Sequence, residues 1–146
     1  DGTTYPTLMT KRQTPKRATL IKRLDQAFSK YTRLVDADEA GMVSCFTCDS
    51  VRHWSEVDCG HFMSRACMST RWDPQNAKPQ CKRCNGFRSG EQYLFAQHLD
   101  RLYGPGTADL VLARSKTLRK FSAEELLEML KTYTDMAEDE RAKRGI

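Results

Sequence analysis

The sequence lacks any run of about 18 apolar residues, the length that a membrane-spanning helix requires. It also lacks internal repeats, low-complexity segments and the pattern of a signal peptide. Hydrophobic residues make up 39% of the 146 residues and charged residues 29%, which is typical of one domain with a modest core. These features exclude a membrane partner and predict a protein that works in the cytoplasm.

Acidic residues are absent from residues 11–23, a stretch that carries six basic ones. These are Lys11, Arg12, Lys16, Arg17, Lys22 and Arg23. The first ten residues show no periodicity and Pro15 interrupts any helix, so we expect residues 1–18 to form a basic flexible arm. The net charge of +5 fits a polyanion such as DNA. Phosphate contacts and a solvated helix face are both open interpretations of the basic side chains.

Apolar residues at three- and four-residue spacing predict a first helix from Thr19 to about Val35. Three further helices are expected: one opened by Asn85 and stopped at Gly104, a short one from Thr107 to Leu112, and a last one that begins with a capping box at Ser122. The last helix has an apolar stripe of Leu126, Leu127, Leu130, Tyr133 and Ala137. We expect its charged tail, from Glu138 onward, to fray.

Short strands are expected at Met42–Phe46 and within Val51–Phe62. The stretch from Ser64 to Pro79 mixes polar, basic and proline residues, which predicts a loop.

Four of the six cysteines form two C-x-x-C pairs, Cys45 with Cys48 and Cys81 with Cys84, separated by 32 residues. Each pair places two thiolates on a tight knuckle, and two knuckles complete a closed tetrahedral zinc shell. Disulfides or a redox pair are the alternatives. The two remaining cysteines and the paired spacing favour a reducing compartment, so we predict one structural Zn²⁺.

Three polar residues, His61, Asn76 and Asn85, follow in the order of an HNH nuclease site. A neutral imidazole takes the proton of an attacking water near neutral pH, so His61 is the candidate general base. We expect Gly60 to let the backbone approach the substrate. Asn76 would orient the histidine or pin its loop, and Asn85 would bind Mg²⁺ through its amide oxygen. The alternatives are a structural histidine, a simple loop asparagine and a helix N-cap.

The second protein ligand of the catalytic Mg²⁺ (or Mn²⁺) is less obvious. Many HNH sites carry Asp or His directly before the base, and this sequence has glycine there. Asp58 stands three residues before the base, so we nominate its carboxylate as the metal ligand.

The sequence resembles the NinG (Rap) recombination endonucleases of lambdoid phages, and the resemblance covers most of the chain. It is carried by the motif residues Cys45, Cys48, Asp58, Gly60, His61, Phe62, Arg71, Trp72, Asn76, Gln80, Cys81, Cys84, Asn85, Ser89 and Gly90. The HNH order implies an α+β, mostly helical fold with a zinc-knuckle-stabilised ββα (His-Me finger) core and flanking helices. Residues 19–146 would form that single nuclease domain with its C-terminal helices.

The resemblance also implies an activity: metal-dependent, structure-selective cleavage of branched DNA such as D-loops and Holliday junctions in the host cytoplasm. Phosphate contacts are expected from the six basic residues of 11–23, which include Lys22 and Arg23, and from Arg65, Arg71, Lys82, Arg83 and Arg88. Cutting two strands favours a homodimer, for which the helix from Ser122 is the candidate interface. The alternatives are a zinc-stapled DNA-binding module without catalysis and an HNH nuclease that nicks ordinary duplex.

Overall fold

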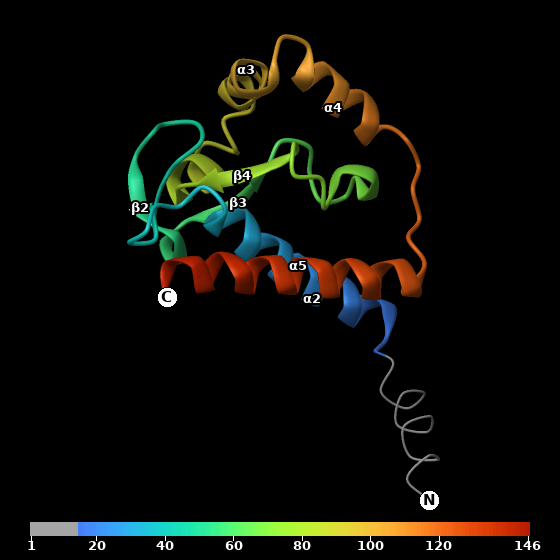
Figure 1. Cartoon of the computed structure of the whole chain (residues 1–146). Coiled ribbons are helices and arrows are strands. Elements are labelled where there is room, and N and C mark those ends of the chain that lie inside the picture. Colours follow the sequence, from blue (N-terminus) through green and yellow to red (C-terminus); the bar gives the residue numbers. More distant parts are fainter. Residues whose placement is uncertain (1–14) are drawn as a thin grey trace, which may run out of the picture.

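The computed structural model describes residues 15–146 (Figure 1). In chain order the elements are α2 (Arg17–Leu34), β1 (Met42–Ser44), β2 (Val51–His53), η1 (Trp54–Glu56), β3 (Asp58–His61), η2 (Met68–Thr70), β4 (Ala77–Gln80), η3 (Arg83–Phe87), α3 (Gln92–Tyr103), α4 (Thr107–Ser115) and α5 (Ala123–Arg144). The first two η elements are 3₁₀ turns and η3 is a π-helical turn. The prediction of a mixed α+β fold in which helices predominate is confirmed.

The antiparallel hairpin of β3 and β4 lies between two helical layers (Figure 1). Its register pairs Asp58 with Gln80 at one end and His61 with Ala77 at the other. On one side the hairpin packs on α2 and α5, through a core whose buried residues are Leu20, Leu24, Phe28, Trp72, Ala77 and Leu126. On the other side lies a second core, which α3 and α4 form together with the segment after β3. Its buried residues are Phe62, Phe95, Leu99, Ala108 and Val111. The hairpin is therefore held from both faces.

Helix α2 forms because Leu20, Leu24 and Phe28 recur every four residues and place one continuous stripe in the core. Full burial of each such side chain contributes about 1.5–3 kcal/mol to the free energy of unfolding. The helix starts at Arg17, two residues before the predicted start and inside the predicted arm. Lys11 and Arg12, which the prediction assigned to that arm, lie outside the described residues.

Helix α5 runs beside α2 in the same direction. The predicted capping box is confirmed, because the Ser122 side chain accepts from Glu125 N and the Glu125 side chain accepts from Ser122 N. The expectation that the tail frays is wrong. The helix continues to Arg144, whose guanidinium donates to the carbonyl of Ala37 at 2.8 Å and so ties the end of α5 to the end of α2. Leu127, predicted in the buried stripe, is 48% exposed.

Two further expectations are corrected around the hairpin. The predicted loop through Pro79 instead ends in strand β4, where proline fits because its carbonyl accepts a hydrogen bond from Phe46 N at 2.8 Å while its missing N–H is not needed. Asn85 does not open the long helix. Ser89, Gly90 and Glu91 all have positive φ angles (52°, 88° and 48°), which separates η3 from α3.

No helix in the described part of the chain is long and apolar enough to cross a membrane.

Candidate functional site

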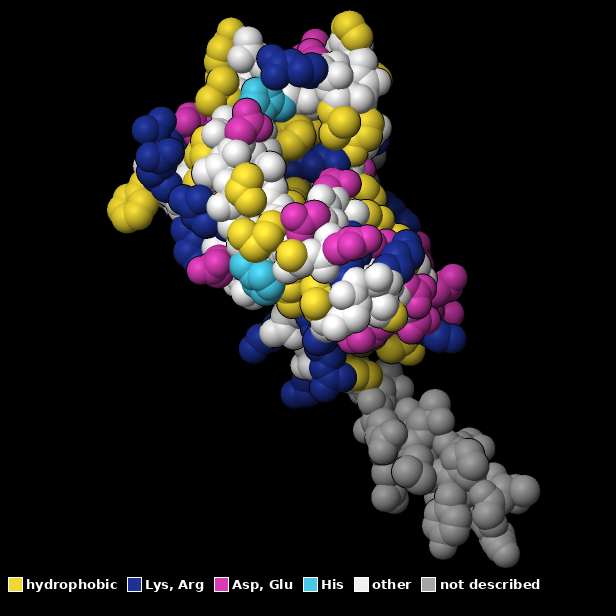
Figure 2. Space-filling view, turned by 60° about the vertical axis from the view of Figure 1, so that its left-hand side comes forward, with side chains coloured by type: hydrophobic (Ala, Val, Ile, Leu, Met, Phe, Trp, Pro, Cys, Tyr) yellow, Lys and Arg dark blue, Asp and Glu magenta, His cyan; other side chains and the backbone are white. Residues whose placement is uncertain are grey.

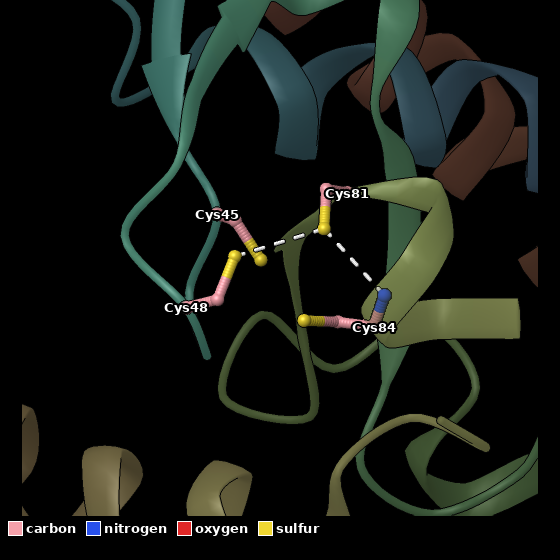
Figure 3. Close-up of side chains that lie close together, drawn as sticks. All are labelled: Cys45, Cys48, Cys81 and Cys84. Atoms are coloured by element: carbon pink, nitrogen blue, oxygen red, sulfur yellow. Dashed lines mark hydrogen bonds between the residues drawn. The ribbon is translucent and has the colours of Figure 1, made fainter. Parts of the chain in front are cut away.

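The four predicted zinc ligands come together at one end of the hairpin. Cys45 and Cys48 lie on the loop between β1 and β2, whereas Cys81 and Cys84 lie where β4 enters η3. Their sulfur atoms all lie within 4.8 Å of one another and point toward a common centre (Figure 3). The cluster joins the small β1–β2 sheet to the β3–β4 hairpin, two segments that pair separately.

The spacing of the sulfur atoms fits zinc. A tetrahedron with Zn–S bonds of about 2.3 Å has S···S edges of about 3.8 Å. The Sγ atoms of Cys48 and Cys81 are 3.7 Å apart. Four thiols so close repel one another when ionised, and only a cation at the centre compensates four thiolates. The prediction that these cysteines form a group that could hold a zinc ion is confirmed.

Hydroxyl and amide groups surround the sulfur cluster. The Oγ of Ser50 lies 3.1 Å from Cys48 Sγ, and the Thr47 hydroxyl lies 3.6 Å from Cys45 Sγ. Burial opposes ionisation of Cys48, but the hydrogen bonds of Ser50, Cys45 and Cys81 together outweigh it and lower the pKa of that thiol to about 6. Burial raises the pKa of Cys84 to about 12. Hydroxyls that donate to ligand thiolates are the usual outer partners of a zinc site.

A cleft of about 840 Å³ opens beside the hairpin, on the other side of η3 from the sulfur cluster. It is lined by three of the predicted catalytic residues: Asp58 and His61 from the two ends of β3, and Asn85 from η3. The structure thus brings together side chains that are up to 27 residues apart in the sequence.

His61 is held by a backbone contact. Its Nε2 lies 3.0 Å from the carbonyl oxygen of Arg71. A carbonyl only accepts, so Nε2 carries the hydrogen and the neutral ring keeps Nδ1 unprotonated. Burial lowers the pKa of His61 below its ordinary value of 6.5. The imidazole is therefore neutral near pH 7, as a general base requires.

Asn76 is completely buried and pins the loop between β3 and β4. Its Oδ1 accepts from Met63 N at 2.8 Å, and its Nδ2 donates to the carbonyls of Met63 and Thr70, both at 3.0 Å. The second of these carbonyls directly precedes Arg71, whose own carbonyl holds the histidine. Asn76 thus fixes the loop through the backbone of Met63, a residue that lines the cleft, but is not itself a lining residue.

Asp58 and Asn85 form a hydrogen-bonded pair of oxygen-rich side chains. Asn85 Nδ2 donates to Asp58 Oδ2 at 3.0 Å, and Lys82 Nζ donates to Asp58 Oδ1 at 2.7 Å. Burial opposes ionisation of Asp58, but the bonds from Lys82 and Asn85 lower its pKa below the ordinary value. Within the described residues, Asn85 Oδ1 accepts no hydrogen bond. The pair offers hard oxygen donors at a place already occupied by a cationic group.

Gly60 has a role other than the predicted one. A Cβ at this position would lie 1.9 Å from Gln80 Oε1, so glycine makes room for the buried glutamine and not for a substrate. Gln80 Nε2 donates to Thr47 Oγ1 at 3.0 Å and to the Gly90 carbonyl at 2.9 Å. One side chain therefore links the hairpin to the zinc knuckle and to the turn after η3.

The predicted phosphate-binding residues divide into groups. Arg65 lines the cleft, and Lys22 is exposed one helical turn before Asp25, another lining residue. Lys82, Arg83 and Arg88 are exposed around η3, whereas Arg23 lies at a groove beside α5. Lys16 is exposed, but the Arg17 guanidinium contacts the Phe121 carbonyl. On the face in Figure 2, Lys and Arg side chains gather at the left edge and below, and Asp and Glu side chains at the lower right.

Asp25 is a cleft residue that the sequence did not reveal. It accepts from Arg71 Nη2 at 2.6 Å and from Trp72 Nε1 at 2.9 Å. Arg71 was predicted to contact phosphate, but its side chain is 18% exposed and paired, and Trp72 is buried. They therefore belong to the frame of the loop. No local signal marks Asp25, because its partners lie 46 and 47 residues away.

The other two histidines lie outside both clusters. His98 Nδ1 contacts the Phe46 carbonyl at 2.5 Å, which gives this histidine a structural role. His53 Nδ1 lies 2.7 Å from Ser55 Oγ, and the described metal-ligand cluster comprises cysteines alone.

The comparisons with known proteins give one match. A family model described as Bacteriophage Lambda NinG protein matches residues 7–142, which include both cysteine pairs and all three cleft residues. No curated protein and no solved structure matches the chain.

Proposed function

The chain belongs to the bacteriophage lambda NinG family, and from this premise we propose that it is a metal-dependent endonuclease of the HNH (His-Me finger) type that cuts branched DNA. The observation that carries the proposal is the meeting of Asp58, His61 and Asn85 in one cleft. The hairpin followed by η3 supports a ββα core in shortened form, because Asn85 stands on the turn that follows β4. A DNA-binding module needs neither a neutral histidine nor a carboxylate–amide pair at these positions.

His61 would act as the general base. The Arg71 carbonyl holds the proton on Nε2, which leaves Nδ1 to take a proton from water as the water oxygen attacks phosphorus. The P–O bond to the leaving oxygen then breaks, and that oxygen takes up a proton. Arg65 and the exposed basic side chains around η3 would bind the neighbouring phosphates.

Asp58 and Asn85 would hold a divalent cation such as Mg²⁺ or Mn²⁺. Carboxylate and amide oxygens suit these ions, and the Lys82 ammonium on Asp58 indicates that the carboxylate attracts a cation. When bound, the cation would neutralise charge on the phosphate and the leaving oxygen. The cysteine cluster is chemically different, since soft thiolates select zinc.

The test is cleavage of labelled Holliday junctions, D-loops and linear duplex of matched sequence, each with and without Mg²⁺. We expect Mg²⁺-dependent cleavage of the branched substrates and little of the duplex. Equal cleavage of all three substrates would favour a nuclease that nicks ordinary duplex. Salt-sensitive binding without any cleavage in Mg²⁺ or Mn²⁺ would favour a non-catalytic module and overturn the proposal.

A homodimer belongs to the same proposal, because symmetric cutting of two strands needs two sites related by a two-fold axis. Helix α5 offers a surface for it, where Leu127 is 48% exposed beside Leu130, Lys131 and Thr134. Sedimentation of the protein alone and on a junction would give the oligomeric state. We expect Leu127→Asp to favour the monomer, and a wild-type monomer in both conditions would contradict the dimer.

A further inference from the structure

Phe87 is almost entirely exposed. Its relative solvent exposure is 92%, and it belongs to none of the hydrophobic clusters of the described residues. It ends η3, the turn that carries Asn85 into the cleft. Added bulk on the neighbouring Gly86 would meet no atom within 4 Å, so the outer face of this turn is open. Single exposed apolar side chains are common on protein surfaces, so the neighbours of the ring must indicate what it binds.

The charges around Phe87 indicate what covers it. Lys82, Arg83 and Arg88 are all exposed within five residues of the ring. Arg88 pairs with Glu91 at 3.2 Å, and Lys82 pairs with Asp58. An aromatic ring among cationic side chains matches a nucleic acid, whose phosphates meet the cations while its bases offer flat apolar faces.

We propose that Phe87 stacks on a nucleobase exposed at a DNA branch and thereby sets the position of the cut relative to that branch. The inference rests on the proposed function and adds a specificity-determining residue to it. Consecutive Cα atoms are 3.8 Å apart, so the Cα atoms of Phe87 and Asn85 are separated by at most about 7.6 Å. With bases spaced about 3.4 Å along a strand, the ring reaches bases within a few steps of the phosphate at Asn85.

Stacking at this position would distinguish branched from linear DNA. In an intact duplex each base face is covered by its neighbours, and inserting an apolar side chain costs a few kcal/mol of unstacking per step. At a branch the stack is interrupted and a base face is available without that cost. The same ring would therefore strengthen binding to a junction and contribute little on duplex.

The experiment uses full-length protein and junctions that carry 2-aminopurine at successive positions around the branch. Binding is measured by fluorescence anisotropy and stacking by 2-aminopurine emission, without added Mg²⁺ and without a chelator that would strip zinc. Phe87→Ala is compared with Phe87→Trp, which keeps a stacking ring. Leu118→Ala is the matched control, since Leu118 is 99% exposed beside Arg119 and Lys120 but lies on the connector between α4 and α5 and not on η3.

We expect Phe87→Ala to weaken junction binding on the order of 5- to 100-fold, to change duplex binding less than about 2-fold, and to remove the 2-aminopurine change at one position. Phe87→Trp should retain both signals and Leu118→Ala should resemble wild type. Wild-type junction binding by Phe87→Ala with an unaltered emission change would overturn this inference and leave the endonuclease intact. A wild-type protein that binds no DNA would overturn both, and would leave a protein partner or an anionic surface to explain the ring.

Discussion

The cysteine cluster and the cleft share the short turn η3, in which Cys84 faces one and the next residue, Asn85, faces the other. The cysteine cluster consists of four like groups that repel one another when ionised and depend on an ion at their centre. In the cleft, Lys82 and Asn85 compensate Asp58, and the Arg71 carbonyl orients His61. The comparison predicts different effects for the two proposed metals: an ion held by the cysteines should support the fold, and an ion held by Asp58 and Asn85 should support the proposed reaction.

Removing zinc should have the largest effect, because it should disrupt the cysteine cluster and the cleft together. We expect one tightly bound Zn²⁺ per chain, and we expect a strong chelator or Cys84→Ser to unfold the hairpin and remove Asn85 from the cleft, because structural zinc contributes on the order of 10 kcal/mol to folding. Metal analysis and circular dichroism provide the measurement. Cys67→Ser is the matched control, because Cys67 lies outside the cluster. A folded metal-free protein, or a disulfide among the four cysteines, would contradict this prediction.

Replacing His61 with Ala should slow cleavage by about 10²- to 10⁴-fold and leave zinc content and junction binding unchanged. The pH dependence of the cleavage rate tests which protonation state of His61 is active. The base acts when neutral, and its pKa is lowered from 6.5, so the wild-type rate should rise with pH through a midpoint below pH 6.5. Single-turnover rates from pH 5 to 9 would test this. His61→Ala should lose that acid limb and recover partly at high pH, where hydroxide replaces the base; a wild-type rate in this variant would refute the HNH assignment.

Asn76→Ala should destabilise the loop between β3 and β4 without changing the binding of zinc or substrate. Three backbone groups would lose their partner in a buried site, which costs on the order of 3 kcal/mol in the free energy of unfolding. Urea unfolding measures it. Asn76→Asp keeps the acceptor for Met63 N and loses the two donors, so the pair of variants separates these contributions. Unchanged stability in both variants would show that the loop is held by other contacts.

Replacing Lys82 with Met should have the smallest effect. The ammonium occupies Asp58 Oδ1, so its removal should strengthen Mn²⁺ binding at Asp58 and Asn85 by about 2- to 5-fold, a modest gain because the Lys82 side chain is 69% exposed and screened by water. Titration calorimetry with Mn²⁺ reads this independently of cleavage. Arg83→Met is the control, an exposed basic residue of the same turn without a bond to Asp58. Equal Mn²⁺ affinity in all three proteins would show that the ammonium does not compete.

The parts predictable from sequence were those with short-range rules. The C-x-x-C spacing predicts the sulfur cluster and the Ser122–Glu125 spacing predicts the capping box, since each geometry is set within one turn. Strand β4 was missed because proline weakens strand signals and the pairing with β3 spans the loop between them. The interrupted helix after Asn85 depends on three left-handed residues, only one of them glycine. The ion pairs of Asp25 join residues that no local pattern connects.

The contact that orients His61 has a consequence for how related sequences diverge. Its acceptor is a main-chain carbonyl, an atom that every amino acid provides, so substitution at position 71 need not disturb the histidine provided the loop keeps its path. The side chains at positions 25 and 71 can then vary only together and with position 72, because Asp25 accepts from both Arg71 and Trp72. Position 76 has no such freedom, because its amide binds the backbone from both sides. An alignment of relatives should therefore show coupled variation at 25 and 71 beside an invariant asparagine, an evolutionary signature of a base oriented by the backbone.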